Sequence, residues 1–390
     1  MLVTRGLGGL CQALLFALLA RAIDTVAFGE INVLLGIAIF LGVLADLGLS
    51  SFIVKAYAID GDFNKVEAAL RVNGFSTLAF TLLLSAIYLS AAGALGLNPW
   101  LVLIVCWIAV EKNIEAQLCV FIAQQDVLAP AISITLRRVI PVLCFLPMTL
   151  LGVSAEISFC VSLLLGAFLG QVHASIALRP HRARWMVSRI HPMSVIREAL
   201  PFSLTNIAGQ ARNLDTPIVA FAAGTAAAGL FAASSKAAIP VFLVATAIGA
   251  AVMPAVAKGG RAFSRRLLRG LVIGLVTSCG IAVLALPFAD RVMTLIYGYG
   301  YARTGSLFIL IVLGIIFAAA ASPLIALSQA HGGTRETATI GIIFAVLLLG
   351  GIAGGSTIGG LYGAGWAALL VYLSRTVVLI LVARTRIGRD

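Results

Sequence analysis

Long apolar stretches, separated by short polar breaks, run along the whole 390-residue chain. The first six cover residues 6–22, 31–54, 73–94, 99–124, 127–152 and 157–178. After a polar segment, six more cover residues 200–222, 226–256, 268–289, 305–329, 338–354 and 360–383. Most are close to the roughly 20 apolar residues that an α-helix needs to cross the hydrocarbon core of a bilayer. The pattern therefore predicts about twelve transmembrane helices.

The last two stretches are separated by a turn of only four residues, at 354–357. Seven glycines lie between positions 350 and 363, with the small-xxx-small spacing that lets two helices approach closely. This spacing predicts a tight helical hairpin without a binding role.

The composition excludes an ordinary soluble domain. The chain is 61% hydrophobic and 11% charged, whereas soluble domains have about 45–50% apolar and about 25% charged residues. Inside lipid, every backbone N–H and C=O group must be paired within the protein, which leaves helices or closed barrels. The apolar stretches are far longer than the roughly ten-residue strands of a membrane barrel. We therefore expect an all-α polytopic membrane protein whose connections are too short to hold a catalytic domain.

Lysines and arginines are concentrated in alternate connections, and such connections stay on the cytoplasmic side. They lie at 55–71, 179–197 and 258–269, at Arg335, and in the tail at Arg384, Arg386 and Arg389. The opposite connections hold little beyond Arg21, Arg291 and Arg303. This asymmetry predicts that both termini are cytoplasmic. It also explains the net charge of +12, because the basic residues lie in loops beside anionic lipid and do not indicate nucleic-acid binding.

A basic segment in the middle divides the chain into two halves of six stretches each. We expect an N-terminal six-helix bundle at 1–178, a basic cytoplasmic connecting segment at 179–198, and a C-terminal six-helix bundle at 199–390. The halves also echo each other faintly. Phe28 and Gly29 lead into a long stretch in the first half, and Gly229 and Leu230 do so in the second. Internal repeats of this kind are typical of secondary transporters.

Several ionisable residues lie inside apolar stretches, where a charge near the bilayer centre costs at least about 2.5–3.5 kcal/mol. They are Asp46, Glu111, Lys112, Glu115, Arg137, Arg138, Arg212, Asp215, Lys236 and Arg375, of which Arg375 can snorkel to the cytoplasmic face. Glu111 and Glu115 share one helical face, while the polar residues Asn113, Gln117 and Gln124 follow another. We expect these side chains to face the bundle interior or water.

Two interpretations of these charges remain open. Arg212 with Asp215, and Lys112 with Glu115, have the i, i+3 spacing of simple intrahelical ion pairs. The combined charge of the adjacent guanidiniums at 137 and 138 is larger than one carboxylate can neutralise, and both groups stay charged at any accessible pH. This favours a water-filled cavity with a cationic lining, suited to a phosphate or pyrophosphate.

The sequence gives no indication of a metal site, a cofactor or a catalytic residue. The six cysteines lie inside apolar stretches without metal-ligand spacing, and the four histidines lie at stretch ends or in loops. The motifs G-x-x-x-x-G-K-[ST], H-E-x-x-H and G-x-S-x-G do not occur. We therefore expect a protein that is not an enzyme and does not hydrolyse nucleotides.

Short motifs along nearly the whole chain have a familiar order and spacing. They are Phe28-Gly29, LADLGL at 44–49, LPF at 200–202, Asp215 followed by AGLF at 228–231, Pro254-Ala255, and YGYGY at 297–301. Taken together, they make the chain resemble the Wzx-like O-antigen and exopolysaccharide flippases of the multidrug/oligosaccharidyl-lipid/polysaccharide (MOP) superfamily.

This resemblance implies two six-helix bundles facing each other across a cavity, in a multi-pass protein of the bacterial inner membrane. The implied function is to flip an undecaprenyl-diphosphate-linked oligosaccharide by alternating access, for polysaccharide or lipopolysaccharide biosynthesis. A polysaccharide polymerase and export machinery are the implied partners. Arg137, Arg138, Arg212 and Lys236 would then bind the diphosphate. An ion-coupling or cavity network would comprise Asp46, Glu111, Lys112, Glu115 and Asp215.

Two other classes of function remain as alternatives. A small-molecule or cation antiporter of the MATE type would need carboxylates in its cavity, and the cations here are at least as prominent. An integral membrane glycan-modifying enzyme would need a large external loop or a membrane-embedded histidine, and neither is apparent in the sequence.

Overall fold

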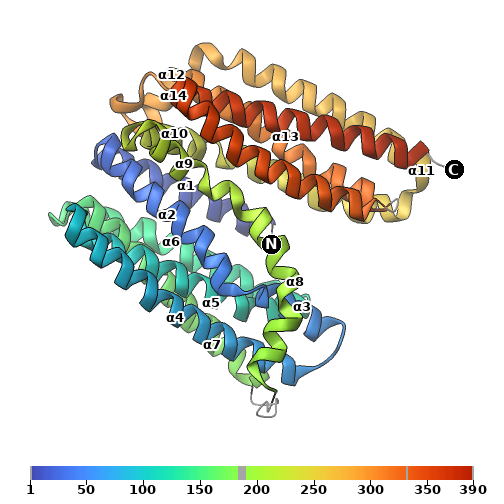
Figure 1. The fold of residues 1–390 in the computed structure, drawn as a ribbon, viewed down its shortest axis with the longest axis horizontal. Coiled ribbons are helices and arrows are strands. Elements are labelled where there is room, and N and C mark those ends of the chain that lie inside the picture. The colour runs from blue at the N-terminus through green and yellow to red at the C-terminus, as the bar shows by residue number, and fades with distance from the viewer. Residues whose placement is uncertain (1, 183–189, 331–332, 389–390) are drawn as a thin grey trace. The chain divides into compact units, whose positions relative to one another are not determined.

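The computed structural model describes residues 2–182, 190–330 and 333–388, and it is helical throughout (Figure 1). These residues form fourteen α-helices and three short 3-10 helices, without a β-strand among them. The predicted all-α class is therefore confirmed.

In the first half of the chain the helices are α1 (Leu2–Ala22), α2 (Thr25–Asp46), α3 (Leu49–Ala58), α4 (Phe63–Leu95), α5 (Val102–Ala123), α6 (Leu128–Leu150) and α7 (Ala155–Arg182). The second half contains α8 (Pro192–Gln210), α9 (Asp215–Ala223), α10 (Thr225–Ala237), α11 (Ile239–Leu284), α12 (Leu286–Tyr297), α13 (Gly305–Ala330) and α14 (Thr334–Gly388). The 3-10 helices are η1 (Pro99–Leu101), η2 (Ala211–Leu214) and η3 (Tyr299–Tyr301).

Seven of the described helices are long and apolar enough to cross a membrane, by length and composition. They are α2, α4, α6, α7, α13, and parts of α11 and α14. The chain is therefore a multi-pass membrane protein. The count of twelve spans and the cytoplasmic location of both termini stay predictions.

Some predicted spans are interrupted helices. The stretch 31–54 breaks at Leu47 and Gly48, which both have positive φ angles of 52° and 78°. A Cβ atom on Gly48 would lie 2.6 Å from the carbonyl oxygen of Ala199 in α8, so this glycine permits a close helix approach. The stretch 226–256 divides between α10 and α11, where Pro240 lies in the first turn of α11 and its missing N–H suits a new helix start.

The predicted hairpin near the C-terminus is confirmed. The backbone leaves the helical conformation at Gly359 and Gly360 inside α14, slightly later than the predicted turn at 354–357. A Cβ atom on Gly355 would lie only 2.3 Å from the carbonyl oxygen of Gly363. The two arms of α14 therefore pack backbone against backbone at these glycines.

The chain forms two compact units, and each consists of two segments. Unit 1 comprises Met1–Leu15 and Leu34–Asn213, and unit 2 comprises Phe16–Val33 and Leu214–Asp390. Part of the predicted first bundle thus packs within unit 2, and residues 199–213 pack within unit 1. The predicted bundles are consecutive halves of the sequence, whereas the two units group residues by their contacts. The bundle boundaries at 178 and 199 therefore stay predictions.

Within unit 2, α2 and α10 cross where each has a glycine. A Cβ atom on Gly29 would lie 2.1 Å from the carbonyl oxygen of Thr225, and one on Gly229 would lie 2.0 Å from that of Thr25. The two segments share the pattern Thr-x-x-x-Gly, and each glycine rests on the threonine of the other. The segments that are similar in the two halves thus each begin a helix, and these two helix starts contact each other.

Next to this crossing, unit 2 contains a buried aromatic cluster. The ring of Phe28 lies 6.4 Å from that of Tyr297 and 5.9 Å from that of Tyr301, centroid to centroid, and Phe16 packs against it from α1. Burial raises the pKa of both tyrosine hydroxyls, so these side chains stay neutral. Tyr297 and Tyr301 of the YGYGY motif therefore pack their rings against the start of α2.

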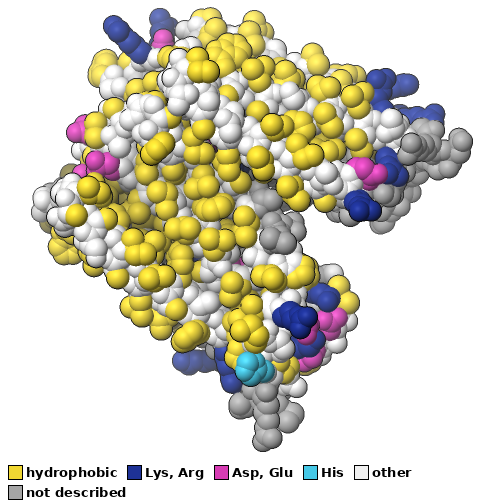
Figure 2. Space-filling model, viewed as in Figure 1, with side chains coloured by type: hydrophobic (Ala, Val, Ile, Leu, Met, Phe, Trp, Pro, Cys, Tyr) yellow, Lys and Arg dark blue, Asp and Glu magenta, His cyan; other side chains and the backbone are white. Residues whose placement is uncertain are grey.

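Within each unit, an ion pair joins two segments that are predicted to lie on the same side of the membrane. In unit 1, Lys65 pairs with Glu198 at 2.8 Å, and in unit 2 Arg386 pairs with Glu336. On the predicted opposite side, Arg21 donates to the last carbonyl groups of α12. Figure 2 shows apolar side chains over the long sides of the helices and Lys and Arg near their ends. This distribution fits helices that cross a bilayer.

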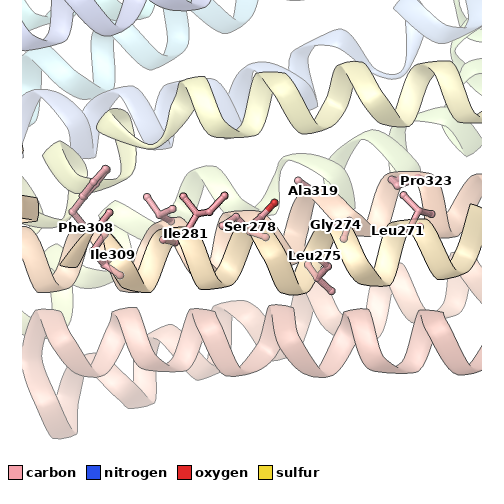
Figure 3. A pocket seen from close by; sticks show the side chains of 15 residues that line it. Leu271, Gly274, Leu275, Ser278, Ile281, Phe308, Ile309, Ala319 and Pro323 are labelled. Atoms are coloured by element: carbon pink, nitrogen blue, oxygen red, sulfur yellow. The ribbon is translucent and has the colours of Figure 1, made fainter.

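An apolar groove of about 620 Å³ separates parts of α11 and α13 (Figure 3). Leu271, Leu275 and Ile281 line it from α11, and Phe308 and Pro323 line it from α13. Gly270 and Gly274 also border it, and a Cβ atom on either would meet nothing within 4 Å. These glycines therefore do not mark a close helix contact.

Replacing Gly29 with alanine should destabilise unit 2, because the added methyl group would overlap the backbone of α10. Overpacking of this kind costs roughly 1–3 kcal/mol. We expect Gly29→Ala to lower the unfolding temperature of the detergent-solubilised protein in a thermal-shift measurement. Gly274→Ala is the matched control, since it has open space around it. Equal unfolding temperatures for the two variants would contradict this account of the crossing.

Candidate functional site

The central helix of unit 1 is α5, which contacts α3, α4, α6 and α7. It has 22 residues, yet it is not among the seven apolar spans, and it carries Glu111, Lys112 and Glu115 in its middle. Glu111 is buried, whereas the Glu115 side chain is 46% exposed. Other helices therefore surround most of the charge on α5, as expected when lipid excludes it.

Glu111 bridges the two adjacent arginines of α6. Nη1 of Arg137 donates a hydrogen bond to Oε2 of Glu111, and Nη1 of Arg138 lies 3.6 Å from Oε1. Both partners of the first pair are buried, whereas the Arg138 side chain is 24% exposed. The structure thus shows one carboxylate in contact with both guanidiniums, while only the first contact is a hydrogen bond.

The remaining charges lie one turn along α5. Nζ of Lys112 donates to Oε2 of Glu115 at 2.7 Å, which is the intrahelical pair that the spacing suggested. Asp46, at the end of α2, is buried and lies close enough to Lys112 and Glu115 for their charges to act on it. Ser50 donates its hydroxyl to Oδ1 of Asp46 at 2.5 Å.

Together these six residues form what we call the ion network: Asp46, Glu111, Lys112, Glu115, Arg137 and Arg138. It holds three carboxylates and three cations, so its formal charge is zero when all are ionised. Glu111 Oε1 and Arg137 Nε are buried and have no hydrogen-bond partner among the described residues. The network is therefore balanced in charge but leaves hydrogen-bonding capacity unused.

Glycines on two other helices make room for the two arginines. A Cβ atom on Gly170 of α7 would lie 2.5 Å from Cγ of Arg137, and one on Gly8 of α1 would lie 3.2 Å from Cγ of Arg138. A Cβ atom on Gly42 of α2 would instead lie 2.7 Å from Cγ2 of Ile108, so this glycine permits the close approach of α2 to α5. A side chain at Gly170 would push Arg137 away from Glu111. Sequence reasoning missed these glycines, because the partner of a small residue in an apolar stretch is unknown before the helices pack.

A second face of α5 carries neutral polar contacts. Asn113 donates to Oε1 of Gln171 at 3.0 Å, and Ser175 donates to Oε1 of Gln117 at 3.3 Å. Further along, Gln124 donates to the Tyr57 hydroxyl at 2.6 Å. The amides that the sequence placed on one face of α5 therefore connect it to α3 and α7, which fixes its rotation within unit 1.

The other three predicted site residues lie outside the ion network. Arg212 is exposed in η2 of unit 1. Asp215 begins α9 of unit 2 and accepts hydrogen bonds from Thr216, so the two residues belong to different compact units. Lys236 of α10 lies 4.9 Å from the centroid of the Phe16 ring, a cation–π contact within unit 2.

The fold and the ion network define the class of this protein: a multi-pass helical membrane protein with charges enclosed in its bundle. It belongs to the polysaccharide biosynthesis protein family, whose model matches residues 1–259. The resemblance to the MOP superfamily is confirmed by this match together with the fold. No curated protein sequence matches the chain.

Solved structures share the fold over nearly the whole chain. An inward-facing multidrug resistance MATE family transporter of the MOP superfamily has a TM-score of 0.72 at 15% identity, covering 97% of this chain and 94% of its own. The lipid II flippase MurJ, in an inward closed conformation, has a TM-score of 0.74 at 14% identity, covering 99% and 87%. A Vibrio cholerae MATE transporter has a TM-score of 0.63 at 13% identity, covering 99% and 97%. At these identities the likeness concerns the fold alone.

Removing the bridging carboxylate should destabilise unit 1. Glu111→Gln leaves a buried guanidinium without its counter-charge, which typically costs about 3–5 kcal/mol of unfolding free energy. The double variant Glu111→Gln/Arg137→Gln should recover part of this loss, because it also removes the unpaired charge. Thermal unfolding of the three proteins in detergent measures the coupling. Strictly additive losses would show that the two side chains do not depend on each other.

Proposed function

We propose that this protein moves an undecaprenyl-diphosphate-linked oligosaccharide across the bacterial inner membrane by alternating access. The family description, polysaccharide biosynthesis, supports a glycan cargo. The shared fold with a lipid II flippase supports a lipid-linked one. The polysaccharide polymerase and export machinery act on such a cargo after it is flipped.

The observation that carries this proposal is the unequal pairing of the two arginines. Arg137 is buried and hydrogen-bonded to Glu111, whereas Arg138 is more exposed and only 3.6 Å from the same carboxylate. A guanidinium held this loosely can exchange a carboxylate for a phosphate, to which it binds bidentately. Arg138 is then the group that receives the diphosphate. The pair of Arg137 and Glu111 holds the Arg138 side chain in place. Arg212 and Lys236 serve as further phosphate contacts.

Asp46 provides a route to ion coupling. When it is ionised, the ion network is neutral, and when it is protonated, the network has one net positive charge. The positive state attracts an anionic headgroup more strongly, since charges interact strongly in a bundle with little water. Proton binding at Asp46 thereby favours cargo binding. Glu111, Lys112 and Glu115 fix the charge around it, and Asp215 is the corresponding carboxylate candidate in unit 2.

An antiporter of the MATE type is the second candidate, because the ion network holds as many carboxylates as cations. A cationic drug would pair with Asp46 or Glu115, whereas a diphosphate would pair with Arg138. The two functions therefore depend on different members of the same network.

Arg138→Gln should reduce flipping of a lipid-linked glycan in proteoliposomes. A hydrogen bond to a charged group contributes about 1.5–3 kcal/mol, so the initial rate should fall roughly 10- to 100-fold. Arg138→Lys should retain part of the rate, and Arg291→Gln, which removes an exposed arginine, should retain all of it. Wild-type flipping by Arg138→Gln at unchanged thermal stability would refute the proposed role. Drug efflux by the wild type without glycan flipping would establish the antiporter instead.

Asp46→Asn should remove the pH dependence of cargo binding. In the wild type, rising pH deprotonates Asp46, so binding of a polyprenyl diphosphate should weaken as pH rises. The asparagine variant imitates the protonated state and should bind with a constant affinity across the same pH range. Asp60→Asn is the matched control, since that carboxylate is exposed. A wild-type pH profile in Asp46→Asn would exclude Asp46 as the coupling group.

A further inference from the structure

A pocket of about 600 Å³ lies at the end of unit 2 near the C-terminus. It is lined by Arg265, Leu268, Arg269, Val272 and Ile273 of α11 and by Ile380, Arg384 and Ile387 of α14. Figure 2 shows Lys and Arg side chains gathered near this end of the unit. Three guanidiniums therefore share one small space with apolar side chains.

These three arginines have no ion pair or side-chain hydrogen bond with any residue that the structure describes. Their neighbour Arg386, in the same helical turn as Arg384, pairs instead with Glu336. If these arginines served only as part of an ion-paired surface, carboxylates should pair with them as Glu336 pairs with Arg386. Three unpaired cations around one pocket instead suit an anionic ligand with several oxygen acceptors.

The rest of the pocket is apolar and continues into surface suited to lipid. Leu268 and Ile387 belong to a buried core cluster that forms the floor. Ile273, which lines the pocket, is 66% exposed, and Leu381, one turn before Arg384 on α14, is 54% exposed. Arg269 and Arg384 lie at the ends of the predicted stretches 268–289 and 360–383, where lipid headgroups are expected to meet the helices. A free inorganic anion would gain nothing from these apolar walls.

We infer that this pocket binds an anionic glycerophospholipid of the bilayer. Arg265, Arg269 and Arg384 hold its phosphate, and Ile273 and Ile380 contact the first part of its acyl chains. Basic pockets between membrane helices are known to hold such headgroups. The site connects α11 to the second arm of α14, and it shares no residue with the ion network.

Native mass spectrometry of the full chain, titrated with phosphatidylglycerol, tests this site. The triple variant Arg265→Gln/Arg269→Gln/Arg384→Gln should bind the lipid roughly 100-fold more weakly than the wild type. The matched control is Arg179→Gln/Arg266→Gln/Arg335→Gln, which removes the same charge from exposed positions outside the pocket. It should change the affinity less than about twofold if binding depends on the pocket.

Ligand competition identifies the source of the phosphate. Phosphatidylcholine and inorganic phosphate should not displace the bound phosphatidylglycerol. Equal loss of binding in both triple variants would show that only net charge matters and would overturn the site. Unchanged binding in the pocket variant would overturn it as well. Preferential displacement by a polyprenyl diphosphate would show that the pocket receives the cargo rather than a bilayer phospholipid.

Discussion

The pairing of Glu111 with Arg137 is the interaction on which unit 1 depends. An unpaired charge in a membrane helix is costly, and α5 carries three ionisable side chains, Glu111, Lys112 and Glu115. The helix is tolerated because it lies at the centre of the unit, where α6 supplies counter-charges and α3, α4 and α7 cover its other faces. Removing Glu111 leaves the buried Arg137 guanidinium without its counter-charge, which is why such a pair is sensitive to substitution even where it adds little net stability.

Small residues set the geometry around this pair. Gly8 and Gly170 leave the space through which the stems of Arg138 and Arg137 reach the network. In unit 2, glycines act instead between backbones, at the crossing of α2 with α10 and in the hairpin of α14. Membrane helices gain little from burying apolar surface against one another, so close packing at small residues is what determines their positions.

The ion network is balanced in charge, whereas the sequence favoured a lining with an excess of positive charge. Three carboxylates accompany the three cations, so attraction for an anion arises from exchange of partners or from protonation rather than from a fixed excess of positive charge. Arg138, loosely held at 3.6 Å from Glu111, and buried Asp46 are the members that can change state. The unpaired arginines at the end of unit 2 differ in kind, because they face apolar helix surface at the headgroup level and have no counter-charge to exchange.

The sequence by itself determined the class of structure, because composition and the length of apolar stretches leave few options in a bilayer. It also singled out Asp46, Glu111 and Arg137, which are buried, since an ionisable residue inside such a stretch stands out, whereas Arg212 and Glu115, singled out in the same way, are exposed. The glycines near the C-terminus indicated the hairpin. Only the tertiary structure decided which charges meet. Glu111 lies 26 residues from Arg137 along the chain, so no local spacing indicated that these two side chains pair. Helix packing, which no local pattern encodes, also decided that Gly170 touches Arg137 and that the long stretch 31–54 breaks at Gly48.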